Sequence, residues 1–159
     1  MPTEDIILEP ARDEMQLVHI PATVLKTDNN GQRTVWRGNS IIAYEYGTTP
    51  SAWVRWLIVI KAFVPVKEAP ISILHIEDGF CTLARFLGTG YQHRILLPES
   101  VMEQFVPVET PFSSGDWTVN IANTGTFDFI LFNIGRQTTS ADKDILVPHL
   151  KPEGLLLQP

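Results

Sequence analysis

The sequence predicts an all-β fold: a two-layer antiparallel β-sandwich of the jelly-roll type, with a partly closed β-barrel as the alternative. Three observations lead to this prediction. About eight segments have the residue types of strands, and turn signals separate them roughly every 8 to 12 residues. No helical pattern of about ten residues lies between these segments, as the crossovers of a parallel sheet would require.

The first expected hairpin joins segments 23–27 and 32–36 through the polar turn 28–31, whose Asp-Asn-Asn-Gly sequence suits positive backbone φ angles. Segments 117–122 and 126–131 are predicted to form a second, half-buried hairpin, because large apolar residues alternate with small polar ones in both. Further strands are expected at 39–46, 52–64, 71–77, 80–87 and 91–97. One short helix is predicted near 98–105, where Ser100 and Glu103 have the spacing of a capping box.

The segment 52–64 is rich in β-branched and aromatic residues, which favours a strand. One of its faces is wholly apolar and is expected to lie in the core. The other face is apolar only in its middle, at Trp53, Leu57 and Val59, so we expect a protein partner to cover it.

Three regions are predicted along the chain: an N-terminal arm 1–20, a sandwich body 21–137 and a C-terminal arm 138–159. Within the first arm, segment 11–18 is compatible with a helix or with an extended chain. The second arm ends in three consecutive leucines, which we expect to contact a partner surface: Leu155, Leu156 and Leu157.

Composition excludes several classes of protein. The chain of 159 residues has 44% hydrophobic and 19% charged residues, which is ordinary for one globular domain. A net charge of −6 argues against nucleic acid as a partner, and no apolar run reaches the length of a membrane helix. The single cysteine and the absence of a secretion signal predict the cytoplasm, or a particle assembled there.

One candidate metal site is apparent. His75 and Glu77 would share a face of a strand, and His93 on a neighbouring strand would complete a set of two histidines and one carboxylate. A surface strand that ends in an acidic turn explains the same residues more simply. Cys81 is interpreted as a core residue rather than a nucleophile. No catalytic residue, metal or cofactor is therefore predicted.

Trp36 and Trp53 stand next to arginines and are candidates for a ligand-binding, sugar-stacking surface. In size, charge and layout the chain is similar to small jelly-roll structural proteins of virus particles. The leading hypothesis is therefore a non-catalytic assembly protein, an auxiliary decoration or capsid-associated component of a virus-like particle, forming a homo-oligomer or bound to a larger scaffold. The alternatives are a carbohydrate- or ligand-binding β-sandwich module and a small metal-dependent, cupin-like enzyme.

Overall fold

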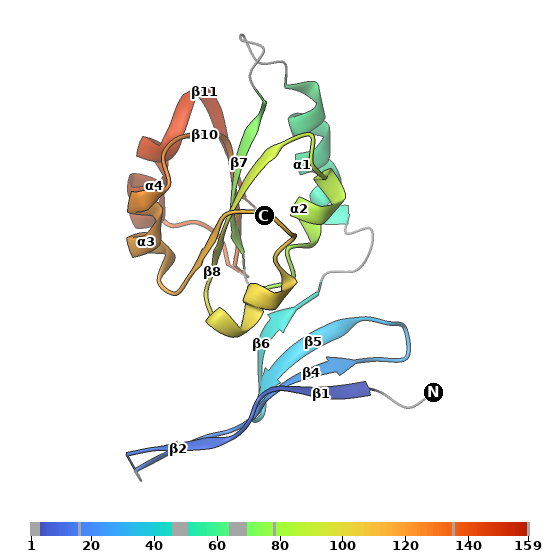
Figure 1. Ribbon diagram of the computed structural model, residues 1–159. Helices are drawn as coiled ribbons and strands as arrows, with labels where there is room; N and C mark the ends of the chain where they lie inside the picture. Colours follow the sequence, from blue (N-terminus) through green and yellow to red (C-terminus); the bar gives the residue numbers. More distant parts are fainter. Residues whose placement is uncertain are drawn as a thin grey trace. The chain divides into compact units, whose positions relative to one another are not determined.

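The computed structural model describes residues 4–15, 17–45, 51–63, 70–77, 79–134 and 136–158, and Figure 1 labels most of its helices and strands. The chain divides into two compact units, Met1–Thr48 and Thr49–Pro159, which we call unit 1 and unit 2.

Unit 1 contains an antiparallel sheet of four strands in the order β1-β4-β5-β6 and a separate two-stranded ribbon of β2 and β3. Asp28 Oδ1 accepts hydrogen bonds from the amides of Asn30 (2.8 Å) and Gln32 (3.0 Å), and Gly31 adopts a φ of 79°. This turn joins β4 and β5 as the sequence predicts, whereas the described residues of segment 11–18 are not helical and include β2. The strands are β1 (Glu4–Glu9), β2 (Arg12–Glu14), β3 (Val18–Ile20), β4 (Thr23–Thr27), β5 (Arg33–Arg37) and β6 (Ser40–Tyr44).

Unit 2 contains a five-stranded sheet in which every neighbouring pair is parallel (Figure 1). The spatial order is β11-β10-β7-β8-β9. The chain starts at the central strand β7, adds β8 and β9 on one side, and then returns to add β10 and β11 on the other. This is the order of a doubly wound, Rossmann-like sheet, whose direction of growth reverses between β7 and β10. The strands are β7 (Ser72–Glu77), β8 (Gln92–Leu97), β9 (Phe112–Ser114), β10 (Phe127–Asn133) and β11 (Leu150–Leu157).

Helices pack on both faces of this sheet and bury two apolar clusters. The first cluster joins α1 and α2 to the sheet through Trp56, Ile60, Ile73, Leu83, Phe129 and Leu131. The second joins η2 and α4 to the opposite face through Leu74, Ile76, Leu96, Phe127, Ile130, Phe132, Ile121 and Leu146. Strands β7 and β10 are therefore buried on both faces. The helices are α1 (Ser51–Ala62), α2 (Thr82–Leu87), η1 (Ser100–Phe105), α3 (Trp117–Asn120), η2 (Ile121–Asn123), α4 (Ser140–Leu146) and η3 (Val147–His149).

The antiparallel sandwich, its jelly-roll form and the barrel alternative are thus wrong. The error lies in the length expected of the helical crossovers. A parallel connection needs a dozen or more residues in total, not a helix of ten. The connection 78–91 between β7 and β8 meets this need although its helix α2 has only six residues.

Three segments expected to be strands are helical. Segment 52–64 falls mostly in α1, where the two fully packed side chains Trp56 and Ile60 are four residues apart, one helical turn. Segment 80–87 contains α2, and 117–122 lies in α3 and η2, so the predicted hairpin 117–131 does not form. The short helix predicted near 98–105 is present as the 3₁₀ helix η1.

The segment 138–159 forms part of unit 2. A capping box between Thr139 and Asp142 starts α4, and β11 follows. The three terminal leucines pair with β10 in the sheet: Leu155 with Phe129, Leu156 with Ile130, and Leu157 with Leu131. Among the residues that the structure describes, no helix is long and apolar enough to cross a membrane.

Candidate functional site

The carboxyl ends of β7, β8, β9 and β10 form the first candidate site, which we call the carboxyl edge. Open α/β sheets bind ligands outside the carboxyl ends of their strands, at the point where the strand order reverses. In unit 2 this point lies between β7 and β10. Glu77 and Asn133 are the last residues of these strands and are partners in the sheet register. They therefore flank the expected position of a ligand.

The turn that follows β7 has the backbone conformation that glycine usually supplies. Cys81 has φ 55° and ψ 29°, in the left-handed region, and its amide donates a hydrogen bond to Glu77 Oε1. Its side chain is fully buried, and Phe80 packs against Phe105 with ring centroids 4.8 Å apart. Burial, together with the charge of Glu77, raises the pKa of the Cys81 thiol. Glu77 therefore holds the turn in place through this hydrogen bond, and the Cys81 side chain is an unreactive thiol that faces the protein interior.

Acidic residues follow three successive strands at this edge. Glu77 ends β7, Glu99 comes two residues after β8, and Asp116 comes two residues after β9. Asp116 caps α3 by accepting hydrogen bonds from the amide (3.0 Å) and hydroxyl (2.7 Å) of Thr118, which lower its pKa. The carboxyl edge is therefore rich in acceptors, which suit the hydroxyl and cationic groups of a ligand.

The sequence contains one signal for this site that the strand interpretation misses. In Rossmann-like domains an acidic residue follows the first glycine-containing turn by about 20 residues and binds ribose hydroxyls. Here Glu99 follows Gly79 by 20 residues, after the apolar run 95–97. The signal is informative only if segment 72–77 is followed by a helix, and the sequence pattern predicts a strand at 80–87 instead.

The candidate metal ligands are only partly brought together. His75 Nε2 and His93 Nδ1 are 2.8 Å apart, and His93 Nε2 lies 2.8 Å from the carbonyl oxygen of Gly88. Because that carbonyl accepts, His93 Nε2 carries the proton, its Nδ1 accepts, and His75 Nε2 donates. Glu77 instead binds the turn at Cys81. Among the described residues, no group of three histidine, cysteine or acidic side chains is placed to hold a metal ion.

Burial determines the charge of this histidine pair. It lowers the pKa of His75 to about 3, with a further contribution from His93, and it lowers the pKa of His93 as well. Both rings are neutral near pH 7. The pair is therefore a structural link between β7 and β8.

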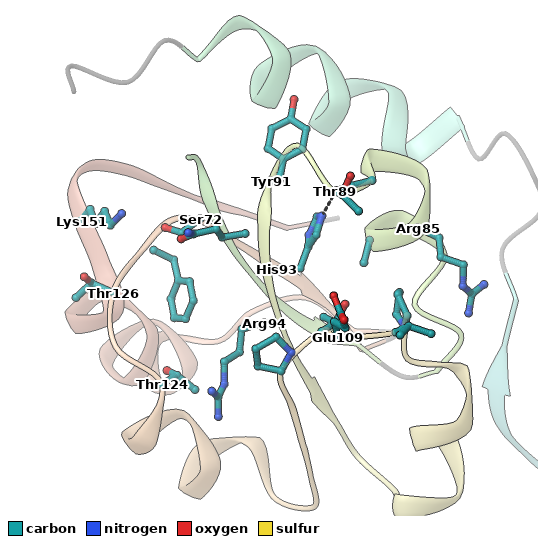
Figure 2. A pocket seen from close by; sticks show the side chains of 18 residues that line it. Ser72, Arg85, Thr89, Tyr91, His93, Arg94, Glu109, Thr124, Thr126 and Lys151 are labelled. Atoms are coloured by element: carbon teal, nitrogen blue, oxygen red, sulfur yellow. Dashed lines mark hydrogen bonds between the residues drawn. The ribbon is translucent and has the colours of Figure 1, made fainter. Parts of the chain in front are cut away.

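A pocket of about 850 Å³ lies at the opposite, amino ends of the strands (Figure 2). The first residues of β7, β8 and β10 line it, namely Ser72, Gln92 and Phe127, together with Lys151 near the start of β11. Figure 2 shows His93 and Arg94 leaving β8 in opposite directions, His93 toward Thr89 and Arg94 toward Thr124. We call this region the amino-edge pocket.

The remaining predicted contact residues are distributed over both units. Trp36 lies on β5, where its Nε1 donates to Thr34 Oγ1 (2.8 Å) and the Lys26 ammonium lies 5.0 Å from its ring centroid. The side chain of Trp53 falls outside the described residues. Leu57 and Val59 are on α1 and pack partly against the first apolar cluster.

Comparisons with solved structures found proteins that are similar to this chain. A SAM-dependent methyltransferase from Agrobacterium tumefaciens matches with a TM-score of 0.53 and 15% identity, over 84% of this chain and 51% of its own. The glycopeptide N-methyltransferase MtfA matches with a TM-score of 0.47 and 18% identity, over 64% of this chain and 49% of its own. Its complex with S-adenosyl-L-methionine gives 0.47 and 17%, over 71% and 55%. The chain spans about half the length of these proteins.

No protein-family model matches the sequence, and no curated protein matches it. The likeness to the Agrobacterium protein establishes a fold, and unit 2 belongs to the Rossmann-like α/β class. The hypothesis of a non-catalytic β-sandwich component of a virus-like particle depended on an antiparallel body and is wrong. Its alternatives, a sugar-binding sandwich and a cupin-like enzyme, depended on the same architecture and are wrong for the same reason.

Proposed function

We propose that unit 2 binds a nucleoside cofactor of the S-adenosylmethionine type at its carboxyl edge, and that the chain acts as a methyltransferase-like enzyme. The observation that carries this proposal is the parallel order β11-β10-β7-β8-β9, with Glu77 and Asn133 flanking the point where it reverses. The class of reaction is that of the similar Agrobacterium structure, which is a SAM-dependent methyltransferase.

The turn after β7 supports close approach of a cofactor to the backbone. A glycine-rich turn usually serves this purpose because it lacks side chains that would keep the ligand away. This chain has one glycine in the turn, Gly79, and keeps the left-handed conformation at Cys81. Because the sulfur is buried, the side chain of Cys81 leaves the solvent side of the turn clear. The residues present thus fit the cofactor.

Acidic side chains would hold the nucleoside. Glu99 has the sequence position of the residue that accepts hydrogen bonds from ribose hydroxyls in this fold. Glu77 would keep the turn in place through its bond to the Cys81 amide, and Asp116 would present acceptors beyond β9. When bound, S-adenosylmethionine supplies a methyl group activated by a sulfonium centre.

The same edge is poorly suited to a dinucleotide. A pyrophosphate is normally bound at the amino terminus of a longer helix, where free backbone amides gather. Helix α2 has only six residues, and the amide of Cys81 already donates to Glu77. The neighbouring carboxylates would repel phosphates. A ligand with hydroxyl groups and positive charge is favoured instead.

The proposal is tested by titrating the full chain with S-adenosylhomocysteine, a stable product analogue, in isothermal calorimetry. We expect saturable binding, and we expect Glu99→Gln to weaken it by about tenfold or more, since the negative charge and one of the two acceptor oxygens are lost. Glu153→Gln, an exposed change of the same kind on β11, is the matched control and leaves binding unchanged. No binding by the wild-type chain at millimolar ligand, or equal binding by Glu99→Gln, overturns the proposal.

A further inference from the structure

We propose that the amino-edge pocket is a second binding site, for a small organic anion whose phosphate or carboxylate group contacts Arg94. The inference goes beyond the proposed function and does not depend on it, since it concerns the opposite ends of the strands. The observation that carries it is a half-buried guanidinium, with a donor that no described residue satisfies, directed into a pocket of about 850 Å³.

Arg94 has donors that the described chain does not satisfy. Its Nε is buried and has no hydrogen-bond acceptor among the described residues, and no ion pair is formed there by its guanidinium. A buried donor left without an acceptor is costly, and a planar guanidinium matches the two oxygens of a carboxylate or phosphate. Because Nε is shielded from solvent, an oxyanion in the pocket would contact the two outer Nη nitrogens, to which no described residue is hydrogen-bonded.

Lys151 also lines the pocket, but an acidic residue pairs with it. Lys151 Nζ lies 3.5 Å from Asp128 Oδ2 and forms an ion pair and a hydrogen bond with it. The same carboxylate oxygen already accepts from the amide of Ser72 (2.9 Å) and from its hydroxyl (3.1 Å). These donors are neutral and leave the negative charge of the Asp128 carboxylate in place, so it offsets the charge of Lys151 and leaves Arg94 as the main contact for an anion.

The remaining ionisable residues of the pocket do not offer a second contact for the anion. Arg85 Nη2 donates to the carbonyl oxygens of Phe80 (2.6 Å) and Phe105 (2.5 Å), so its role is structural. His93 is neutral and uses both ring nitrogens within the chain. Glu109, in an exposed loop with φ 64°, is the acidic residue of the lining and opposes an anion. Recognition therefore depends on Arg94.

The side chains that line the pocket indicate what kind of group carries the anionic part of the ligand. Apolar and aromatic side chains line much of the pocket: Ala84, Tyr91, Pro107, Val108, Pro111 and Phe127. A volume of about 850 Å³ lies within the range of sites for small metabolites. An anionic group attached to a compact apolar or aromatic body fits these features better than a bare inorganic ion.

The test uses phenyl phosphate, benzoate and inorganic phosphate as probes, titrated into the full chain and followed by amide chemical shifts. We expect saturable shifts at residues of the pocket, and phenyl phosphate or benzoate should bind at least severalfold more tightly than inorganic phosphate. The better of the two organic probes distinguishes a phosphate from a carboxylate ligand. The inference is overturned if no probe causes saturable shifts at about 20 mM. This concentration is roughly tenfold above a dissociation constant in the ordinary millimolar range.

Variants locate the contact. Arg94→Gln should weaken phenyl phosphate binding about tenfold or more, and Arg94→Lys should weaken it less, because the charge remains while the planar fork is lost. Lys143→Gln, on the exposed surface of α4, makes the same charge change away from the pocket and should have no effect. If Arg94→Gln does not fold, Arg94→Lys decides the question, and wild-type affinity in whichever of them folds contradicts the inference. Binding of S-adenosylhomocysteine should survive Arg94→Gln, so the two sites fail separately.

Discussion

The carboxyl and amino edges of the unit 2 sheet are formed by the same five parallel strands, yet different charged residues stand at the two edges. Glu77, Glu99 and Asp116 follow strands at the carboxyl edge, whereas Arg94 and Lys151 lie near strand starts at the amino edge. Between the edges the central strands are sealed by apolar packing on both faces. We infer from this comparison that such a sheet can bind ligands only at its two ends. We also infer that the charged side chains at each end favour a different class of ligand.

Protonation of the buried histidine pair is expected to have the largest effect, because loss of folding stability would disrupt both edges of the sheet. In the folded chain the pKa of His75 is about 3, against 6.5 for an ordinary histidine, so the unfolded chain binds more protons between these values. The contribution of His75 to stability is therefore full above pH 6.5, falls as the pH is lowered, and levels off near pH 3. The full loss from this group is about 5 kcal/mol.

Chemical denaturation between about pH 7.5 and 4 measures this effect. His75→Gln retains an amide donor for His93 Nδ1 but cannot be protonated, so its stability should fall less steeply with acid. His19→Gln, which removes an exposed histidine from unit 1, should leave the pH dependence of unit 2 unchanged. A wild-type curve that is flat from about pH 6.5 to 5 would contradict the burial argument.

Gly154 is the position where a single methyl group should most disturb the amino edge. A Cβ there would lie 2.9 Å from the Lys151 oxygen, 3.0 Å from the Phe127 oxygen and 3.1 Å from the Asp128 oxygen, all of them backbone atoms. We expect Gly154→Ala to lower the free energy of unfolding by about 3 kcal/mol. It should also weaken phenyl phosphate binding, because the crowded atoms belong to the segments that carry Lys151 and Asp128.

Thermal denaturation followed by circular dichroism checks this prediction. Gly90→Ala is the matched control, since no atom lies within 4 Å of the position that its added methyl group would take, and its midpoint should hardly change. Equal midpoints for Gly154→Ala and the wild-type chain would mean that β11 shifts freely, which would remove the geometric basis of the pocket.

Cys81→Gly is the smallest change and concerns the carboxyl edge alone. Glycine relieves the left-handed strain at this position, worth about 1 kcal/mol, but gives up a buried side chain of similar value. Net stability should therefore change by less than about 1 kcal/mol. The binding of S-adenosylhomocysteine should be retained or improve, because the backbone conformation is the one that glycine adopts most readily. Calorimetry that shows weaker binding would mean that the Cys81 side chain itself supports the site.

Strand positions were predicted better than strand partners. Segments 71–77 and 91–97 contain β7 and β8, and 126–131 lies mostly in β10. The turn 28–31 was also predicted correctly, because Asp28 and Gly31 determine it locally. Partner choice depends on contacts far along the chain, as when Phe129 pairs with Ile73. No local pattern contains that information.

The helices were missed because short apolar segments have no decisive period. In α1 the β-branched residues of segment 52–64 favour a strand locally, but its Trp56 and Ile60 side chains meet Ile73 and Phe129 only from a helix. Sites were missed for the same reason. Glu99 and Arg94 are informative once β8 is known to be parallel to β7, since direction decides which strand ends share an edge.

The amino-acid sequence by itself determined where most strands lie, which turn closes the first hairpin, and that the chain carries excess acid and a single cysteine. Only the tertiary structure decided that the strands of unit 2 run parallel, that acids gather at one end, and that Arg94 enters a pocket at the other. The physical reason is that local turn chemistry and burial patterns act over a few residues, whereas strand direction and charge clustering arise from packing between segments distant in the chain.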